Sequence, residues 1–123
     1  MSLFSPSDSW LLNAIALAGA SAPASLRDIL AAGDYLNRAI FTWEELQTGL
    51  QRLCGAGLVQ VQEQGFSLSE TFRPEFARLT RQPRVAEALA SVLQTLSPAE
   101  FQETQLPITR TMFEDAIRQY QDA

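Results

Sequence analysis

Few side chains in this sequence could carry catalytic chemistry. All nine basic residues are arginine, and the chain has no lysine and no histidine. Walker-type phosphate loops and pyridoxal Schiff bases need a lysine. Ser-His-Asp and Cys-His catalysis, and most zinc and non-haem iron sites, need an imidazole. The sequence excludes these chemistries, and we predict a protein that is not an enzyme.

One cysteine and several carboxylates remain as chemical candidates. Cys54 is the only cysteine, so no intrachain disulfide and no CxxC metal site can form. No lysine or histidine can activate its thiol, and its place on an apolar stripe favours a small buried hydrophobe. Glu44-Glu45 and Glu114-Asp115 stand where helices are expected to begin, so capping and the helix dipole explain them better than a cation or a hydrolase pair. We predict no metal and no cofactor.

The bulk composition is that of one acidic domain with a buried core. The chain has 123 residues, is 46% hydrophobic and carries a formal net charge of −5, with a pI of about 4.6. An acidic balance works against generic binding to nucleic acid or to an anionic membrane. The longest apolar run, Trp10–Ala18, is too short to span a bilayer, and the N-terminus lacks a basic region. We therefore predict a cytoplasmic protein without a membrane partner.

Two helices are predicted in the first third of the chain. The first runs from about Ser9 to Gly19, with Ser7 or Asp8 as its N-cap. The second is opened by Ser25, whose short side chain can accept a hydrogen bond from the first turn. Asn37 is the expected stop, because asparagine tolerates the left-handed conformation.

A third helix and a hairpin follow. The sequence Thr42-Trp-Glu-Glu45 is a full capping box, and Gly57 is the expected stop of the helix that it opens. Residues 58–68 then alternate apolar and polar side chains, which predicts a short β-hairpin with its turn at Gln64-Gly65.

The rest of the chain is predicted to be helical. Phe72, Phe76 and Leu79 share one face of a first segment. Further helices are expected from Pro83 and after Ser97, and a capping box at Thr111 is expected to open the last one. The predicted fold class is thus mainly α, with three helices, a short hairpin and a helical C-terminal extension.

The first half of the chain resembles a winged-helix domain. The likeness rests on residues 25–30 (SLRDIL), 42–46 (TWEEL) and 50–59 (LQRLCGAGLV), and it covers residues 9–69. Residues 34–42 also resemble a stretch of uncharacterised small bacterial proteins, which imply no function. The resemblance implies a winged-helix-like domain over residues 1–69 and a helical extension over residues 70–123. The winged-helix fold serves both DNA binding and protein contact.

A winged-helix DNA reader places its third helix in the major groove. Glu44 and Glu45 lie at the end of this helix that should approach the phosphates, and residues 1–65 hold three arginines against six acids. This charge pattern favours a regulatory or adaptor module that acts through protein contact, with a DNA-binding regulator as the alternative. The side chains that could read bases are Gln47, Thr48, Gln51 and Arg52.

A second group of charged side chains lies in the C-terminal half. Arg78, Arg81 and Arg84 are close enough in sequence to form a basic patch that could meet a phosphate or an acidic partner. Pairing of these arginines with Glu75 and Glu87 is the favoured interpretation.

The C-terminal helices carry more apolar surface than a lone winged-helix domain needs. They either fold back on the first helix or pair with a second chain, and we slightly favour a homodimer. A small-molecule pocket between these helices and the winged-helix-like domain is a third possibility. The residues of the expected interface are Val85, Leu89, Val92, Leu93, Leu96, Met112, Phe113, Ile117 and Tyr120.

Overall fold

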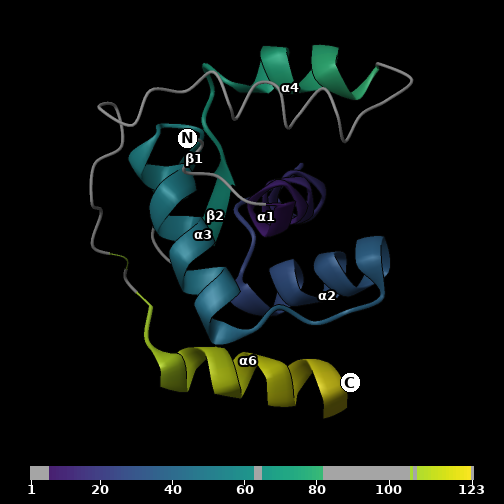
Figure 1. Cartoon of the computed structure of the whole chain (residues 1–123), viewed down its shortest axis with the longest axis vertical. Coiled ribbons are helices and arrows are strands. Elements are labelled where there is room, and N and C mark those ends of the chain that lie inside the picture. Colours follow the sequence, from purple (N-terminus) through teal and green to yellow (C-terminus); the bar gives the residue numbers. More distant parts are fainter. Residues whose placement is uncertain (1–5, 63–64, 82–105, 107, 123) are drawn as a thin grey trace.

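The computed structural model describes residues 6–62, 65–81, 106 and 108–122 (Figure 1). Its described part is mainly helical, with a two-stranded hairpin and a C-terminal helix, which confirms the predicted fold class. The helices predicted from Pro83 and after Ser97 lie outside the described residues. In chain order the elements are α1 (Pro6–Ala18), α2 (Leu26–Asn37), α3 (Trp43–Gly55), β1 (Val59–Gln62), β2 (Gly65–Leu68), α4 (Arg73–Thr80) and α6 (Arg110–Asp122).

Helix α1 forms the centre of the core. It packs against α2 and α3 and against β2, and Figure 1 shows it almost end-on between them. Its side chains Leu11, Leu12, Ala14 and Ile15 are fully buried, whereas Leu17 is 51% exposed. The helix also begins earlier than predicted, because Pro6 is well suited to a first turn.

The N-caps predicted at Ser25 and Thr42 are present. The backbone N–H of Asp28 donates to Ser25 Oγ at 3.2 Å, and the Ser25 N–H donates to Asp28 Oδ2 at 3.3 Å. The Glu45 N–H donates to Thr42 Oγ1 at 3.1 Å, and the Thr42 N–H donates to Glu45 Oε1 at 3.0 Å. These reciprocal bonds satisfy donors that the first turn of a helix leaves free.

Two predicted N-caps and one predicted left-handed residue are wrong. Helix α2 ends at Asn37 as expected, but the left-handed residue is the next one, Arg38, with φ 52° and ψ 39°. Helix α6 is capped by Thr109, whose Oγ1 accepts from the Met112 N–H at 3.2 Å, and not by Thr111. Asp8 lies inside α1 as a buried residue, so it is not the cap of that helix.

The hairpin is joined by a short third segment from the loop between α1 and α2. Strands β1 and β2 are antiparallel, with Val61 opposite Phe66. On the other edge of β2, the Ala24 N–H donates to Phe66 O at 2.7 Å and the Phe66 N–H donates to Ala24 O at 2.9 Å. A Cβ at Gly65 would lie 2.6 Å from Pro23 Cβ, so this close approach requires glycine.

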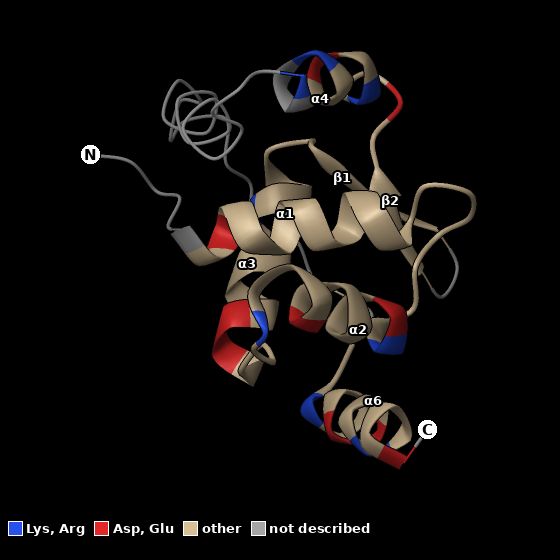
Figure 2. Ribbon diagram, turned by 90° about the vertical axis from the view of Figure 1, so that its right-hand side faces the viewer, with Lys and Arg blue, Asp and Glu red and all other residues tan. Residues whose placement is uncertain are grey.

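Helix α6 packs on the three-helix domain through α2, and both views of the ribbon place it beside that helix (Figures 1 and 2). Phe113 is 6% exposed, and its ring centroid lies 5.6 Å from that of Trp43 at the start of α3. Tyr120 donates its hydroxyl to Asp34 Oδ2 at 2.6 Å. Helix α6 therefore folds back on α2 and the start of α3, whereas the expected arrangement placed the C-terminal helices on the first helix.

Helix α4 begins after a buried aromatic residue. Phe72 is 7% exposed, and Phe76 packs beside it with a centroid separation of 6.1 Å. Arg73 Nε donates to Leu68 O at 3.3 Å, which fixes the start of α4 to the end of β2. The side chain of Leu79, expected on the same face, lies outside the described residues.

Candidate functional site

The candidate base-reading side chains of α3 are only partly accessible. Gln47, Thr48, Gln51 and Arg52 are all half-buried. Arg52 Nη1 lies 3.1 Å from Asp8 Oδ2 and donates a hydrogen bond to it, and the Asp8 side chain is 2% exposed. The guanidinium predicted to reach guanine or a phosphate is thus engaged by a buried carboxylate of α1.

A glycine on α3 brings the two partners of this ion pair together. A Cβ at Gly49 would lie 2.6 Å from Leu11 Cδ2 and 3.1 Å from Asp8 Oδ1. The absence of a side chain at Gly49 therefore lets α1 approach α3 closely enough for Asp8 to meet Arg52, one turn of α3 further along. This pair has no local signal in the sequence, where Asp8 fits the pattern of a helix cap.

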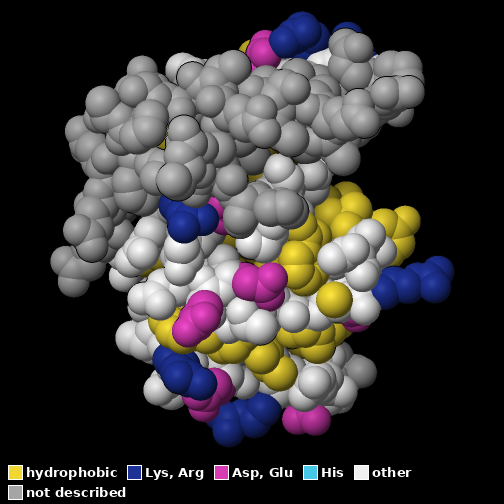
Figure 3. All heavy atoms as spheres, viewed as in Figure 1, with side chains coloured by type: hydrophobic (Ala, Val, Ile, Leu, Met, Phe, Trp, Pro, Cys, Tyr) yellow, Lys and Arg dark blue, Asp and Glu magenta, His cyan; other side chains and the backbone are white. Residues whose placement is uncertain are grey.

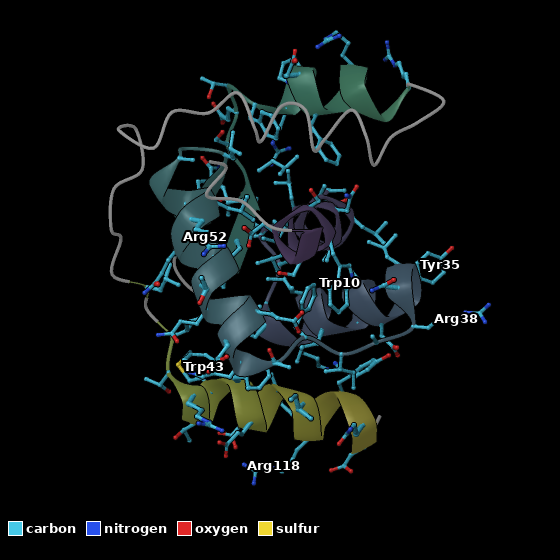
Figure 4. The ribbon with its side chains drawn as sticks, viewed as in Figure 1. Trp10, Tyr35, Arg38, Trp43, Arg52 and Arg118 are labelled. Carbon is cyan, nitrogen blue, oxygen red and sulfur yellow. The ribbon has the colours of Figure 1, made fainter. Side chains whose placement is uncertain are left out.

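The first turn of α3 is acidic, and its Trp43 packs against α6. Trp43 contacts Phe113 of α6, and Figure 4 shows Trp43 between the two helices. Glu44 and Glu45 occupy the first turn, which Figure 2 shows as an acidic end of α3. In a winged-helix DNA reader this end approaches the duplex, where carboxylates repel phosphates.

Arg78 of the predicted basic patch is paired with a neighbouring carboxylate of α4. Arg78 donates to Glu75 through Nη2 at 2.5 Å and through Nε at 3.1 Å, as the charge-pairing interpretation predicts. This hydrogen bond is the main reason why the pKa of Glu75 is lowered and that of Arg78 is raised. Arg81 is exposed, and Arg84 lies outside the described residues.

The thiol of Cys54 has low reactivity in this environment. Cys54 is half-buried on α3, and desolvation raises the pKa of its thiol to about 11. A thiol with such a pKa is almost wholly protonated at neutral pH and is a poor nucleophile. This agrees with its interpretation as a small hydrophobe.

An exposed surface at the end of α2 was not found from the sequence. We call it the α2-end surface and define it as Tyr35, Leu36 and Arg38. Tyr35 is 79% exposed and Leu36 is 45% exposed. Figure 4 shows Tyr35 and Arg38 pointing away from the molecule, and Figure 3 shows hydrophobic surface beside a protruding basic side chain at this edge. In the part of the chain that the structure describes, Arg38 makes no side-chain ion pair.

A pocket of about 600 Å³ lies between the first turn of α2, the hairpin and α6. Its position matches the pocket that the sequence analysis allowed between the C-terminal region and the winged-helix-like domain. Its described lining residues are Ser25, Leu26, Arg27, Asp28, Val61, Gly65, Phe66, Ile108, Met112, Asp115, Ala116 and Gln119.

The residues expected at a dimer interface divide into two groups. Phe113 is buried, Ile117 is partly buried against the core, and Tyr120 bonds to Asp34, all within one chain. Met112 is 46% exposed. The other group, Val85, Leu89, Val92, Leu93 and Leu96, lies outside the described residues.

Within residues 6–62, 65–81, 106 and 108–122, no three His, Cys, Asp or Glu side chains gather closely enough to hold a metal ion. No helix in these ranges combines the length and the apolar character that a membrane span requires. No protein-family model, no curated protein and no solved structure matches the chain significantly.

Proposed function

We propose that this chain is a non-enzymatic regulatory or adaptor module of the winged-helix type that acts through protein contact. The order of elements supports the winged-helix assignment, since three helices precede a hairpin. The bridge from Ala24 to Phe66 adds a third strand segment to the hairpin, beyond what the sequence pattern indicated.

The α2-end surface is the observation that carries the proposal. A tyrosine that is 79% exposed stands next to a leucine that is 45% exposed and an arginine without an ion pair among the described residues. Tyrosine and arginine are enriched among the residues that dominate binding energy at protein interfaces. Arg38 also holds a left-handed backbone conformation that is uncommon for a residue other than glycine.

The α3 surface weighs against the DNA-binding alternative. Arg52 is held by Asp8, Trp43 is covered by Phe113, and the first turn carries two glutamates. DNA binding in this geometry would need a helix that is free and basic at this end.

Site-specific photocrosslinking tests the proposal. A photoreactive phenylalanine replaces Tyr35 in one variant and Gln121, an exposed residue of α6, in a control. We expect a defined protein adduct from position 35 only. The purified partner should then bind the wild-type chain, and Tyr35→Ser should weaken that binding at least about tenfold while Gln121→Ser leaves it unchanged.

A duplex-binding assay separates the two functions. Random duplex DNA is titrated with the chain at low salt and again with added salt. We expect no saturable binding of duplex DNA at either salt concentration. Tight binding that weakens steeply with salt, together with no adduct from position 35, would replace protein contact by DNA binding, because phosphate contacts release counterions.

A further inference from the structure

The pocket beside α6 has the dimensions of a small-molecule site. Its volume of about 600 Å³ lies within the range of roughly 300–1,000 Å³ that is typical of ligand pockets. Leu26 and Phe66 form part of its lining and belong to the buried core. Val61 on β1 and Met112 on α6 also line it, and they are 37% and 46% exposed. Apolar surface from two elements is thus open to a ligand.

The charged side chains of the pocket are not equally available. Asp28 accepts from the Ser25 N–H in the capping box, and Asp115 accepts from Arg118. Arg27 makes no ion pair and no side-chain hydrogen bond in the part of the chain that the structure describes. Asp115 is neutralised by Arg118, and Asp28 lies in the first turn of α2, where the helix dipole offsets its charge. Arg27 is the charged lining side chain that has no partner among the described residues.

We propose that this pocket binds a small amphipathic carboxylate. The apolar body of the ligand packs against Val61, Phe66, Ile108 and Met112, and its carboxylate pairs with Arg27. A guanidinium and a carboxylate form a charge-assisted hydrogen bond, which is stronger than a bond between neutral groups. A cationic ligand fits less well, because it would compete with Arg118 for Asp115 and would lie beside the guanidinium of Arg27. The site is independent of the α2-end surface, since no residue is common to both.

Two probes that share one apolar body test the role of charge. 4-Butylbenzoate carries the carboxylate, and 4-butylbenzamide replaces it with a neutral amide. Each is titrated into the ¹⁵N-labelled full chain and followed by amide chemical shifts. We expect saturable shifts centred on residues 25–28, on the hairpin residues 61–62 and 65–66, and on residues 108–119. Binding of the benzoate should be at least about tenfold tighter than that of the amide.

Two arginine variants then assign the charge to one residue. Arg27→Gln should weaken binding of the benzoate by about tenfold and leave binding of the amide unchanged. Arg78→Gln removes the same charge from α4, outside the pocket, and should change neither affinity. Both arginines are exposed, so both variants should keep the wild-type circular dichroism spectrum.

Three results would overturn the proposal. The first is no saturable shift with benzoate up to millimolar concentration in the wild-type chain. The second is equal affinity for benzoate and benzamide, which would show a pocket that does not select a carboxylate. The third is a set of shifts that lies outside the three segments. The comparison of benzoate and benzamide binding to the wild-type chain tests the proposal even if Arg27→Gln fails to fold.

Discussion

Arg52 of α3 donates a hydrogen bond from Nη1 to Asp8 Oδ2 of α1 across 3.1 Å. The Asp8 side chain is 2% exposed and that of Arg52 is 30% exposed, so the carboxylate is buried while the guanidinium reaches the surface. A buried carboxylate that loses its cation keeps the cost of desolvation. This pair therefore connects α1 to α3 and engages Nη1 of the arginine with a carboxylate of its own chain.

Arg52→Gln should destabilise the chain by about 1–3 kcal/mol, because it leaves Asp8 buried without its cation. The exposed pair of Arg78 and Glu75 provides the control, and Arg78→Gln should cost no more than about 0.5 kcal/mol. Urea unfolding measures both. Equal shifts in the two unfolding midpoints would show that the buried pair contributes no more than a surface pair.

Gly33→Ala should also destabilise the chain, although alanine favours a helix over glycine by about 1 kcal/mol. A Cβ at this position would lie 2.4 Å from Cε2 of Phe41. The Phe41 ring cannot move away easily, since it is 1% exposed and stacks on Trp10 at a centroid distance of 3.8 Å. Trp10 is itself held by a hydrogen bond from Nε1 to Gly33 O at 2.9 Å.

We expect the steric cost to exceed the gain in helix propensity, with a net loss of about 1–3 kcal/mol. Thermal unfolding followed by circular dichroism measures it. The same substitution in a Phe41→Leu background should cost less, because the smaller side chain leaves room for the methyl group. A Gly33→Ala chain that is as stable as the wild type would mean that the ring shifts freely.

Local patterns in the sequence predict the local features of this fold. The N-cap at Ser25 and the capping box at Thr42 were predicted correctly because each depends on residues only three positions apart. Gly57 was also predicted correctly, and its φ of 80° shows why a glycine ends α3 there. The cap of α6 was misplaced because Thr109 lacks the acidic partner that made Thr111 fit the capping-box pattern.

The sites depend on contacts that no local pattern contains. Asp8 and Arg52 are 44 positions apart, and the pocket combines residues of α2, the hairpin and α6. The sequence does contain a signal for the α2-end surface. Tyr35 lies roughly half a turn away from the stripe of Leu26, Ile29 and Leu30, so an apolar residue off the buried face marked this surface.

Because the pKa of Tyr120 is raised in the folded chain, we expect a loss of folding stability at alkaline pH. Its hydrogen bond to Asp34 raises the pKa of Tyr120 above its ordinary value of 10.0, with smaller effects from desolvation and from the Asp34 charge. A pKa that is raised by folding stabilises the folded state below pH 10.0, and this stabilisation is lost as the pH rises through the folded pKa.

A Tyr35→Phe background leaves Tyr120 as the sole tyrosine, so tyrosinate absorbance reports on it alone. Asp34→Asn in that background should lower the pKa of Tyr120. Tyr120→Phe should remove the part of the alkaline stability loss that belongs to this residue. An unchanged tyrosinate titration after Asp34→Asn would contradict the hydrogen bond as the cause.

The attachment of α6 to its own chain can be tested through Phe113. This side chain is 6% exposed and contacts Trp43, so Phe113→Ala should destabilise the chain by about 3 kcal/mol or release α6. The neighbouring Met112 is 46% exposed, and Met112→Ala should cost no more than about 0.5 kcal/mol. Urea unfolding and protease sensitivity near residue 110 measure the difference between the two variants.

Sedimentation of the same variants tests whether this contact lies within one chain or between two. Phe113 and Tyr120 use their side chains inside the chain, so a dimer through α6 would have to break these contacts or exchange the helix between partners. Loss of an intrachain contact changes stability without changing mass. If wild-type protein is a dimer at micromolar concentration and Phe113→Ala alone makes it monomeric, α6 is exchanged between two chains. If both proteins have the same mass, Phe113 belongs to the core of one chain and any dimer uses another surface.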